Sequence, residues 1–224
     1  LAVFASIPFH FTQLEMSFID SLFESMSGLT TTGSTVISGL DYQLPGILIW
    51  RALLQWLGGV GIIVMAISVL PMLKVGGMQL FRSEFSSKDD KILPRTVSIA
   101  IGIGLVYLVL TITCFLSLVS AGMAVFDGIA HALTIIATGG FSTKNMSIGH
   151  FNSVHIETVT IFFMLISSLP FLLLFQFSKG KIFDLLKNSQ VHFFILIVFI
   201  LTIITSFWLQ KYYEVSFLQA LRIS

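Results

Sequence analysis

Four long apolar runs dominate this chain, and they leave it few ways to fold. They cover roughly Leu44–Leu73, Thr96–Gly122, Val154–Phe177 and Val191–Leu209. Each contains the approximately 20 residues that a helix needs to cross the hydrocarbon core of a bilayer, and the longer runs can tilt. The chain is 55% hydrophobic and only 10% charged, far outside the range of soluble globular domains. We therefore predict an all-α polytopic membrane protein embedded in the lipid bilayer, with Leu1–Phe9 as the end of a fifth span.

The basic residues are concentrated in two loops, and this predicts the orientation of the chain. Loop 74–95 and loop 179–190 together carry Lys74, Arg82, Lys88, Lys91, Arg95, Lys179, Lys181 and Lys187. The connections on the other side are nearly free of Lys and Arg, with only Lys144 near the second one. By the positive-inside rule, the basic loops are cytoplasmic. The opposite connections are therefore expected to face outward.

Each of those outward connections contains a short apolar segment followed by a stretch rich in threonine and glycine. The segments are Phe18–Leu29 and Phe126–Ile136; the stretches are Thr30–Thr35 (TTTGST, turn 1) and Ala137–Thr143 (ATGGFST, turn 2). Counted from Gly33 to Gly140 the two turns are 107 residues apart. The same offset aligns Asp20 with Asp127 in the sequence. A long apolar run follows each turn. The order of short helix, turn and long helix is therefore repeated within the chain.

The composition of the turns indicates an ion pathway. Segments of 11 or 12 residues are too short to cross the bilayer as helices, and irregular backbone at membrane depth must be buried in protein or line a watery cavity. Gly33 and Gly140 can adopt positive φ without steric cost, and rings of backbone carbonyls are how proteins strip and hold a weakly hydrated cation. Each short helix also points its partly negative C-terminal end at its turn. The turns carry no carboxylate cage, which argues against a divalent-ion site. The alternative is a simple loop after an interfacial helix, and two such turns in register disfavour it.

The repeat divides the chain into membrane–pore-loop–membrane units. We expect the first unit over 1–73, a cytoplasmic loop over 74–95, the second unit over 96–178, a second cytoplasmic loop over 179–190, and the start of a third unit over 191–224. The third would begin another short helix at Phe217–Leu221 and end before its turn. About two and a half units are therefore expected.

Several separated motifs resemble the membrane subunits of Trk-type potassium transporters, the TrkH/TrkG/KtrB superfamily. They are Ser25–Thr35, Trp50–Ile63, Leu70-Pro71, Val75–Arg82 and turn 2 with the following Ser147-Ile148-Gly149. The resemblance implies four units around one pseudo-fourfold ion pathway, so we expect a fragment truncated at both ends. By position, it implies that the ion-facing carbonyls of the filter belong to Thr31, Thr32, Gly33, Thr138, Gly139 and Gly140. Ser34 follows the glycine of turn 1 whereas Phe141 follows that of turn 2, so we expect weaker discrimination than in a symmetric filter.

The same resemblance implies a function and partners. The implied function is potassium uptake across the bacterial cytoplasmic membrane, driven by the electrochemical gradient, with K⁺ as the transported ion and no covalent cofactor. The implied partners are a second copy in a homodimer and a cytoplasmic nucleotide-binding ring of the TrkA type, with no nucleic acid. A KtrB- or HKT-like transporter linked or permeable to sodium is the nearest alternative. A broken-helix transporter of organic solutes is another, although repeats that run in the same direction argue against it.

A few further residues carry weaker expectations. Asp20 and Asp127 open the two short helices, where N-capping is the ordinary role. Glu24 lies on the same helical face as Asp20 and is placed to pair with Arg51, whose charge within a span is either functional or drawn to the interface. The glycines of Gly58–Gly61 favour close helix packing. The chain shows no catalytic pair or metal-ligand spacing of histidines, so we do not expect an enzyme.

Overall fold

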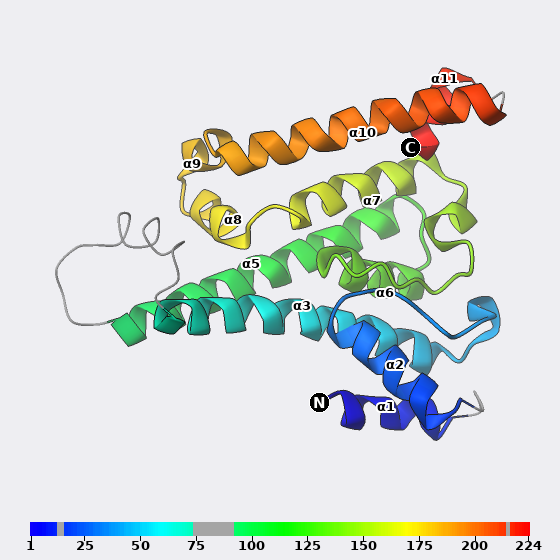
Figure 1. Ribbon diagram of the computed structural model, residues 1–224, viewed down its shortest axis with the longest axis horizontal. Helices are drawn as coiled ribbons and strands as arrows, with labels where there is room; N and C mark the ends of the chain where they lie inside the picture. The colour runs from blue at the N-terminus through cyan, green and yellow to red at the C-terminus, as the bar shows by residue number, and fades with distance from the viewer. Residues whose placement is uncertain (13–15, 74–91, 214–215) are drawn as a thin grey trace. The chain divides into compact units, whose positions relative to one another are not determined.

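The computed structural model describes residues 1–12, 16–73, 92–213 and 216–224, and over these ranges the chain is helical without a strand (Figure 1). It divides into two compact units, Leu1–Phe171 and Leu172–Ser224, which are described separately below. Most of the cytoplasmic loop expected at 74–95 lies outside the described residues.

The first unit carries two short helices among longer ones. Its elements are α1 (Ala2–His10), α2 (Phe18–Leu29), the 3₁₀ turn η1 (Leu40–Tyr42), α3 (Pro45–Leu73), α5 (Ile92–Ser120), α6 (Val125–Ile136), η2 (Ser147–Phe151) and α7 (Val154–Ser167). The second unit contains α9 (Ile182–Leu186), α10 (Ser189–Tyr213) and α11 (Phe217–Ile223), together with all but the first residue of α8 (Phe171–Ser178). In it, α10 packs against both α9 and α11, and α11 confirms the short helix expected after the last apolar run.

The long helices agree with the apolar runs, with one difference. Among the described residues, Ile99–Ser120 and Ser189–Tyr213 are each long and apolar enough to cross a membrane. Helix α3 has 29 residues, about 43 Å at 1.5 Å per residue. The third run is divided into α7 and α8, a pair that counts as a further crossing if it is one broken span. The break falls at Leu169-Pro170, because proline lacks an N–H and disfavours helical backbone in the residue before it.

The two short helices begin differently from our expectation. Ser17, not Asp20, is the N-cap of α2: its Oγ accepts a hydrogen bond from the Asp20 backbone N–H at 3.1 Å and donates to Asp20 Oδ2 at 2.7 Å. Helix α6 has Ala124 at its N-cap and no side-chain cap. The prediction that Asp20 and Asp127 cap these helices is therefore wrong. Both lie in the first turn, where a carboxylate still complements the helix dipole.

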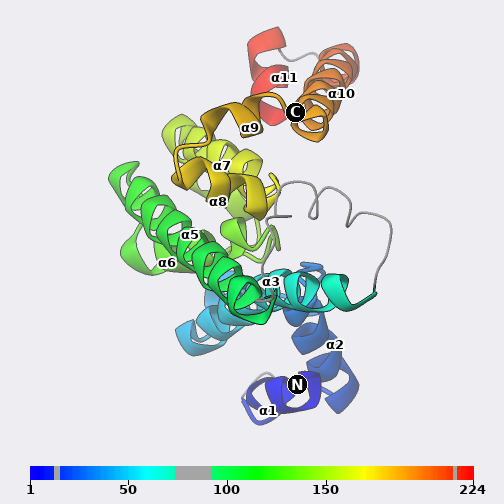
Figure 2. The same cartoon turned by 90° about the vertical axis from the view of Figure 1, so that its left-hand side faces the viewer.

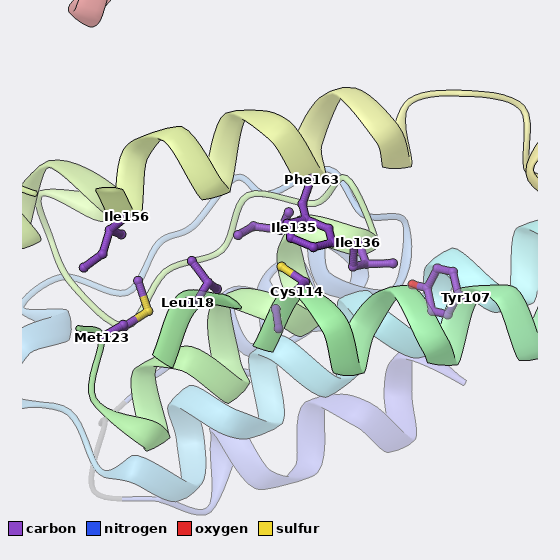
Figure 3. Close-up of a cluster of buried hydrophobic side chains, with 9 residues drawn as sticks. Tyr107, Cys114, Leu118, Met123, Ile135, Ile136, Ile156 and Phe163 are labelled. Carbon is purple, nitrogen blue, oxygen red and sulfur yellow. The ribbon is translucent and has the colours of Figure 1, made fainter. Parts of the chain in front are cut away.

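A buried apolar cluster fixes α6 between its neighbours. Figure 3 shows side chains of α5, α6 and α7 directed toward one another, and the cluster contains Tyr107, Cys114, Leu118, Met123, Ala132, Ile135, Ile136, Ile156 and Phe163. A second cluster joins α1, η1 and α3 through Phe9, Leu40, Leu48 and Leu54, among others. Helix α3 contacts both α2 and α6, so the two short helices end beside the same long helix (Figures 1 and 2).

Candidate functional site

Turns 1 and 2 share one backbone conformation. Thr31 has φ +56° and Gly33 has φ +79°, and the residues 107 positions later, Thr138 and Gly140, have φ +53° and +82°. A threonine in the left-handed region is uncommon and costs conformational energy. The sequence predicted the positive φ of the two glycines, and the structure confirms it. The left-handed threonines were missed, since nothing in their side chains favours that conformation.

The hydrogen bonds that close the short helices repeat in the same register. The Thr32 N–H donates to the Ser27 carbonyl at 2.9 Å, and the Gly139 N–H donates to the Thr134 carbonyl, also at 2.9 Å. One residue earlier, the N–H groups of Thr31 and Thr138 donate to carbonyls three residues back, each at 3.0 Å. These bonds satisfy carbonyls that a helix end leaves open. Each short helix therefore passes into its turn by the same path.

The two turns approach each other at the backbone. A Cβ built on Gly33 would overlap the carbonyl oxygen of Gly139. A Cβ built on Gly139 would overlap the side-chain amide of Gln55. Of the six predicted filter residues, the structure thus brings Gly33 and Gly139 together. Thr32, Thr138 and Gly140 are exposed, Thr31 and Gly33 are half-buried, and Gly139 is buried.

Helix α3 passes close behind both turns because it has glycines where the two short helices end and the turns begin. A Cβ on Gly58 would overlap the backbone of Leu29, the last residue of α2. A Cβ on Gly59 would lie 2.7 Å from the Tyr107 hydroxyl and 3.3 Å from Ala137, the first residue of turn 2. This confirms the prediction of close packing for two of the glycines in Gly58–Gly61. At Gly61 a Cβ would meet nothing within 4 Å.

Arg51, two turns into α3, is buried rather than drawn to the interface. Its side chain is 1% exposed and its Nε lies 2.7 Å from Oε1 of Glu24, which is fully buried. The expected pairing of Glu24 with Arg51 is confirmed. The guanidinium also donates from Nη1 to the Ser142 carbonyl at 3.1 Å and lies 4.1 Å from the centre of the Phe141 ring. Arg51 therefore contacts the helix before turn 1 and the backbone of turn 2.

Gln55 lies one helical turn further along the same face of α3. Its Oε1 accepts a hydrogen bond from the Phe141 N–H at 3.1 Å, and the residue is fully buried. Sequence reasoning missed this residue, because a glutamine inside an apolar run carries no spacing signal of its own. Its side-chain amide and its burial become informative only once turn 2 is known to pack against it.

Each turn is also tied to its own short helix by a hydroxyl. Thr35 Oγ1 donates to Oε1 of Glu24 at 2.9 Å, and the Ser142 hydroxyl is hydrogen-bonded to Nε2 of His131 at 3.0 Å. Both hydroxyls lie two residues after the turn glycine, and the 107-residue offset maps Glu24 onto His131. Extending the offset beyond the turns aligns Glu24 with His131 and Thr35 with Ser142, but the two hydrogen bonds become visible only in the structure. A further bond, from Thr143 Oγ1 to Oδ1 of Asp127 at 2.6 Å, holds the end of turn 2.

Comparison with known proteins places the chain in a family. The model of a family described as TrkH, cation transport protein, matches residues 2–211. The chain belongs to the TrkH family. It is 43% identical to the Trk system potassium uptake protein TrkH of Halomonas elongata, covering 99% of this chain and 47% of that protein. It is 42% identical to TrkH of Escherichia coli K12, covering 93% and 44%.

The TrkH fold is confirmed by a solved structure. The crystal structure of the potassium transporter TrkH from Vibrio parahaemolyticus superposes with a TM-score of 0.86 at 38% identity, covering 99% of this chain and 46% of that one. The chain thus spans about half the length of these relatives. The relatives are named as transport proteins. With its long apolar helices, the present chain is a membrane protein of the TrkH family that is helical over its described residues and repeats the order of short helix, turn and long helix.

Proposed function

We propose that this chain supplies two strands of the selectivity filter of a potassium uptake pathway. The ion-facing carbonyls are those of Thr31, Thr32 and Gly33 in turn 1 and of Thr138, Gly139 and Gly140 in turn 2. The observation that carries the proposal is the matched backbone of the two turns, with left-handed residues at the same two positions in each. Two independent segments of different sequence adopt the same uncommon conformation, which points to a shared function for their backbones.

The conformation suits a site made of carbonyls. In an ordinary strand successive carbonyls point to opposite sides. Residues of positive φ at alternate positions, as in both turns, can direct them toward a common side. The partly negative ends of α2 and α6 lie at the start of the two turns. Oxygen dipoles without an ionised group favour a weakly hydrated monovalent cation, in keeping with relatives named for potassium uptake.

The proposal extends to the driving force, the membrane and the partners. Uptake follows the electrochemical gradient across the cytoplasmic membrane, with turns 1 and 2 toward the outer face, as the basic loops indicate. A homodimer and a nucleotide-binding ring of the TrkA type on the cytoplasmic side follow from the family resemblance. Co-purification of the natural full-length polypeptide with such a ring, and its mass in detergent, test these two partners separately.

Gly140→Ala tests the filter assignment. A Cβ at Gly140 would meet nothing within 4 Å, yet the residue has φ +82°, so alanine changes the backbone preference without a clash. Gly122→Ala is the matched control, because Gly122 also has positive φ and open space around its Cβ but lies between α5 and α6. Left-handed backbone costs an alanine about 1–2 kcal/mol at either position.

The assay is K⁺ uptake into proteoliposomes, with Na⁺ as competitor, by the natural full-length polypeptide. We expect Gly140→Ala to reduce uptake and the preference for K⁺ over Na⁺, while Gly122→Ala keeps both. Equal behaviour of the two variants would contradict the assignment. Uptake by the unmodified protein that requires or equally accepts Na⁺ would instead support the sodium-linked alternative.

A further inference from the structure

The buried charge of Arg51 is placed at the boundary between the two repeats. On one side it is paired with Glu24 of α2, and on the other it contacts the backbone and ring of turn 2. Glu24 in turn accepts hydrogen bonds from Thr35 Oγ1 and from the Val36 N–H at 3.0 Å, immediately after turn 1. A continuous path of charged and polar contacts therefore runs from the end of turn 1 to turn 2.

This path is specific to the first repeat. Arg51 is the seventh residue of α3, and the seventh residue of α7, after turn 2, is Thr160. The carboxylate of Glu24 is likewise replaced by the imidazole of His131 in the second repeat. The Arg51 guanidinium thus serves the contact between the first and second repeats. It is not a feature that every unit needs for folding. A buried ion pair is also weak evidence for stability, since apolar residues of the same size often stabilise a protein as well.

Four contacts made by two residues on one face of α3 hold turn 2 along its length. The Gln55 amide packs against Gly139 and accepts from the Phe141 N–H. The Arg51 guanidinium covers the Phe141 ring and donates to the Ser142 carbonyl. Phe141 and Ser142 follow directly after Gly140, and Gly139 precedes it. Arg51 and Gln55 therefore connect the turn 2 backbone to α3, and Arg51 also connects it to the short helix before turn 1.

We infer that Arg51 is a positioning residue that sets ion discrimination by fixing the spacing between the filter strands of turns 1 and 2. This inference rests on the proposed filter function. The planar guanidinium is suited to the task, because it binds Glu24 and the Ser142 carbonyl through different nitrogens while its face lies on the Phe141 ring. A lysine offers a single flexible ammonium and cannot make these contacts together.

Two variants of the natural full-length polypeptide test the inference. Arg51→Lys keeps the positive charge beside Glu24 but loses the planar guanidinium, whose separate nitrogens bind Glu24 and the Ser142 carbonyl. The double variant Glu24→Gln, Arg51→Gln removes both charges and so leaves no unpaired buried ion. Thr111→Val is the control: it removes the buried hydroxyl that accepts from the Trp56 indole at 3.0 Å, which weakens the packing of α3 on α5 without removing a hydrogen bond to either turn.

The readout is the ratio of the Na⁺ and K⁺ concentrations that half-saturate uptake, which does not depend on how much protein reaches the membrane. We expect this ratio to fall about tenfold in the double variant and at least about threefold in Arg51→Lys, and to stay unchanged in Thr111→Val; tenfold corresponds to about 1.4 kcal/mol. If the unmodified protein takes up K⁺ selectively and both Arg51→Lys and the double variant keep its ratio, this inference about Arg51 is overturned while the proposed function stands. Absence of K⁺ uptake by the unmodified protein would overturn the proposed function.

Discussion

Gly58→Ala is the substitution whose effect follows most directly from the packing of α3. The added Cβ would overlap the carbonyl oxygen and carbonyl carbon of Leu29, at the end of α2. These are backbone atoms, so no side chain can rotate away to make room. Restoring an ordinary C···O separation of about 3.3 Å requires a displacement on the order of 1 Å between α3 and the start of turn 1.

Two terms decide the size of the effect. Alanine is favoured over glycine within a helix by about 1 kcal/mol, whereas overpacking of a close contact costs about 1–3 kcal/mol and occasionally more. Because the contact is backbone on backbone, we take the upper part of that range and expect a net loss of about 1–2 kcal/mol. Gly61→Ala, three residues later, gains the same helix propensity, and its Cβ would meet nothing within 4 Å. The free energy of unfolding should therefore stay unchanged or rise slightly.

Both variants are assayed in the natural full-length polypeptide, by thermal unfolding in detergent and by the K⁺ concentration that half-saturates uptake. Gly58→Ala should unfold at a lower temperature and require more K⁺, because the displaced atoms lead directly into turn 1. Gly61→Ala should do neither. If Gly58→Ala matched Gly61→Ala in both measurements, the close approach of α3 to α2 would be refuted.

Three further predictions concern the surroundings of the turns. Asn145→Ala removes bonds to the Leu40 N–H at 2.9 Å and to Asp41. Since Asn145 itself is exposed, unfolding stability should fall by only about 1 kcal/mol with the preference for K⁺ over Na⁺ unchanged in competition assays, and a loss of that preference would contradict the prediction. Cys114, fully buried in the α5–α7 cluster, should not react with a maleimide until the protein unfolds, as followed by mass; rapid labelling of the folded protein would contradict that packing. Ser17→Ala removes the side-chain cap of α2 and should cost about 1 kcal/mol in thermal unfolding, and an unchanged melting temperature would argue against the cap.

Periodicity and spacing predict the parts of the fold that depend on local sequence. Helix α2 has the bounds that its apolar segment predicts, and α6 begins one residue earlier than expected. The positive φ of Gly33 and Gly140 follows from the freedom of glycine. Pairing of Glu24 with Arg51 was predictable because a buried charge within a span needs a partner.

The contacts between repeats were not predictable, since they depend on which face of α3 meets the turns. Neither the spacing of Arg51 nor that of Gln55 indicates that both side chains reach turn 2. The left-handed conformation of Thr31 and Thr138 likewise accompanies the hydrogen bonds that end each short helix. The cap of α2 was misassigned because a serine and an aspartate three residues apart both suit that end of a helix.

The central claim is that the backbones of turns 1 and 2 bind potassium. Its most direct test is the anomalous signal of Rb⁺ or Tl⁺, used as potassium substitutes, in crystals of the natural full-length polypeptide. We predict density within coordination distance of carbonyl oxygens from both Thr31–Gly33 and Thr138–Gly140. Well-occupied ion density elsewhere in the membrane region, with none at these carbonyls, would contradict the account.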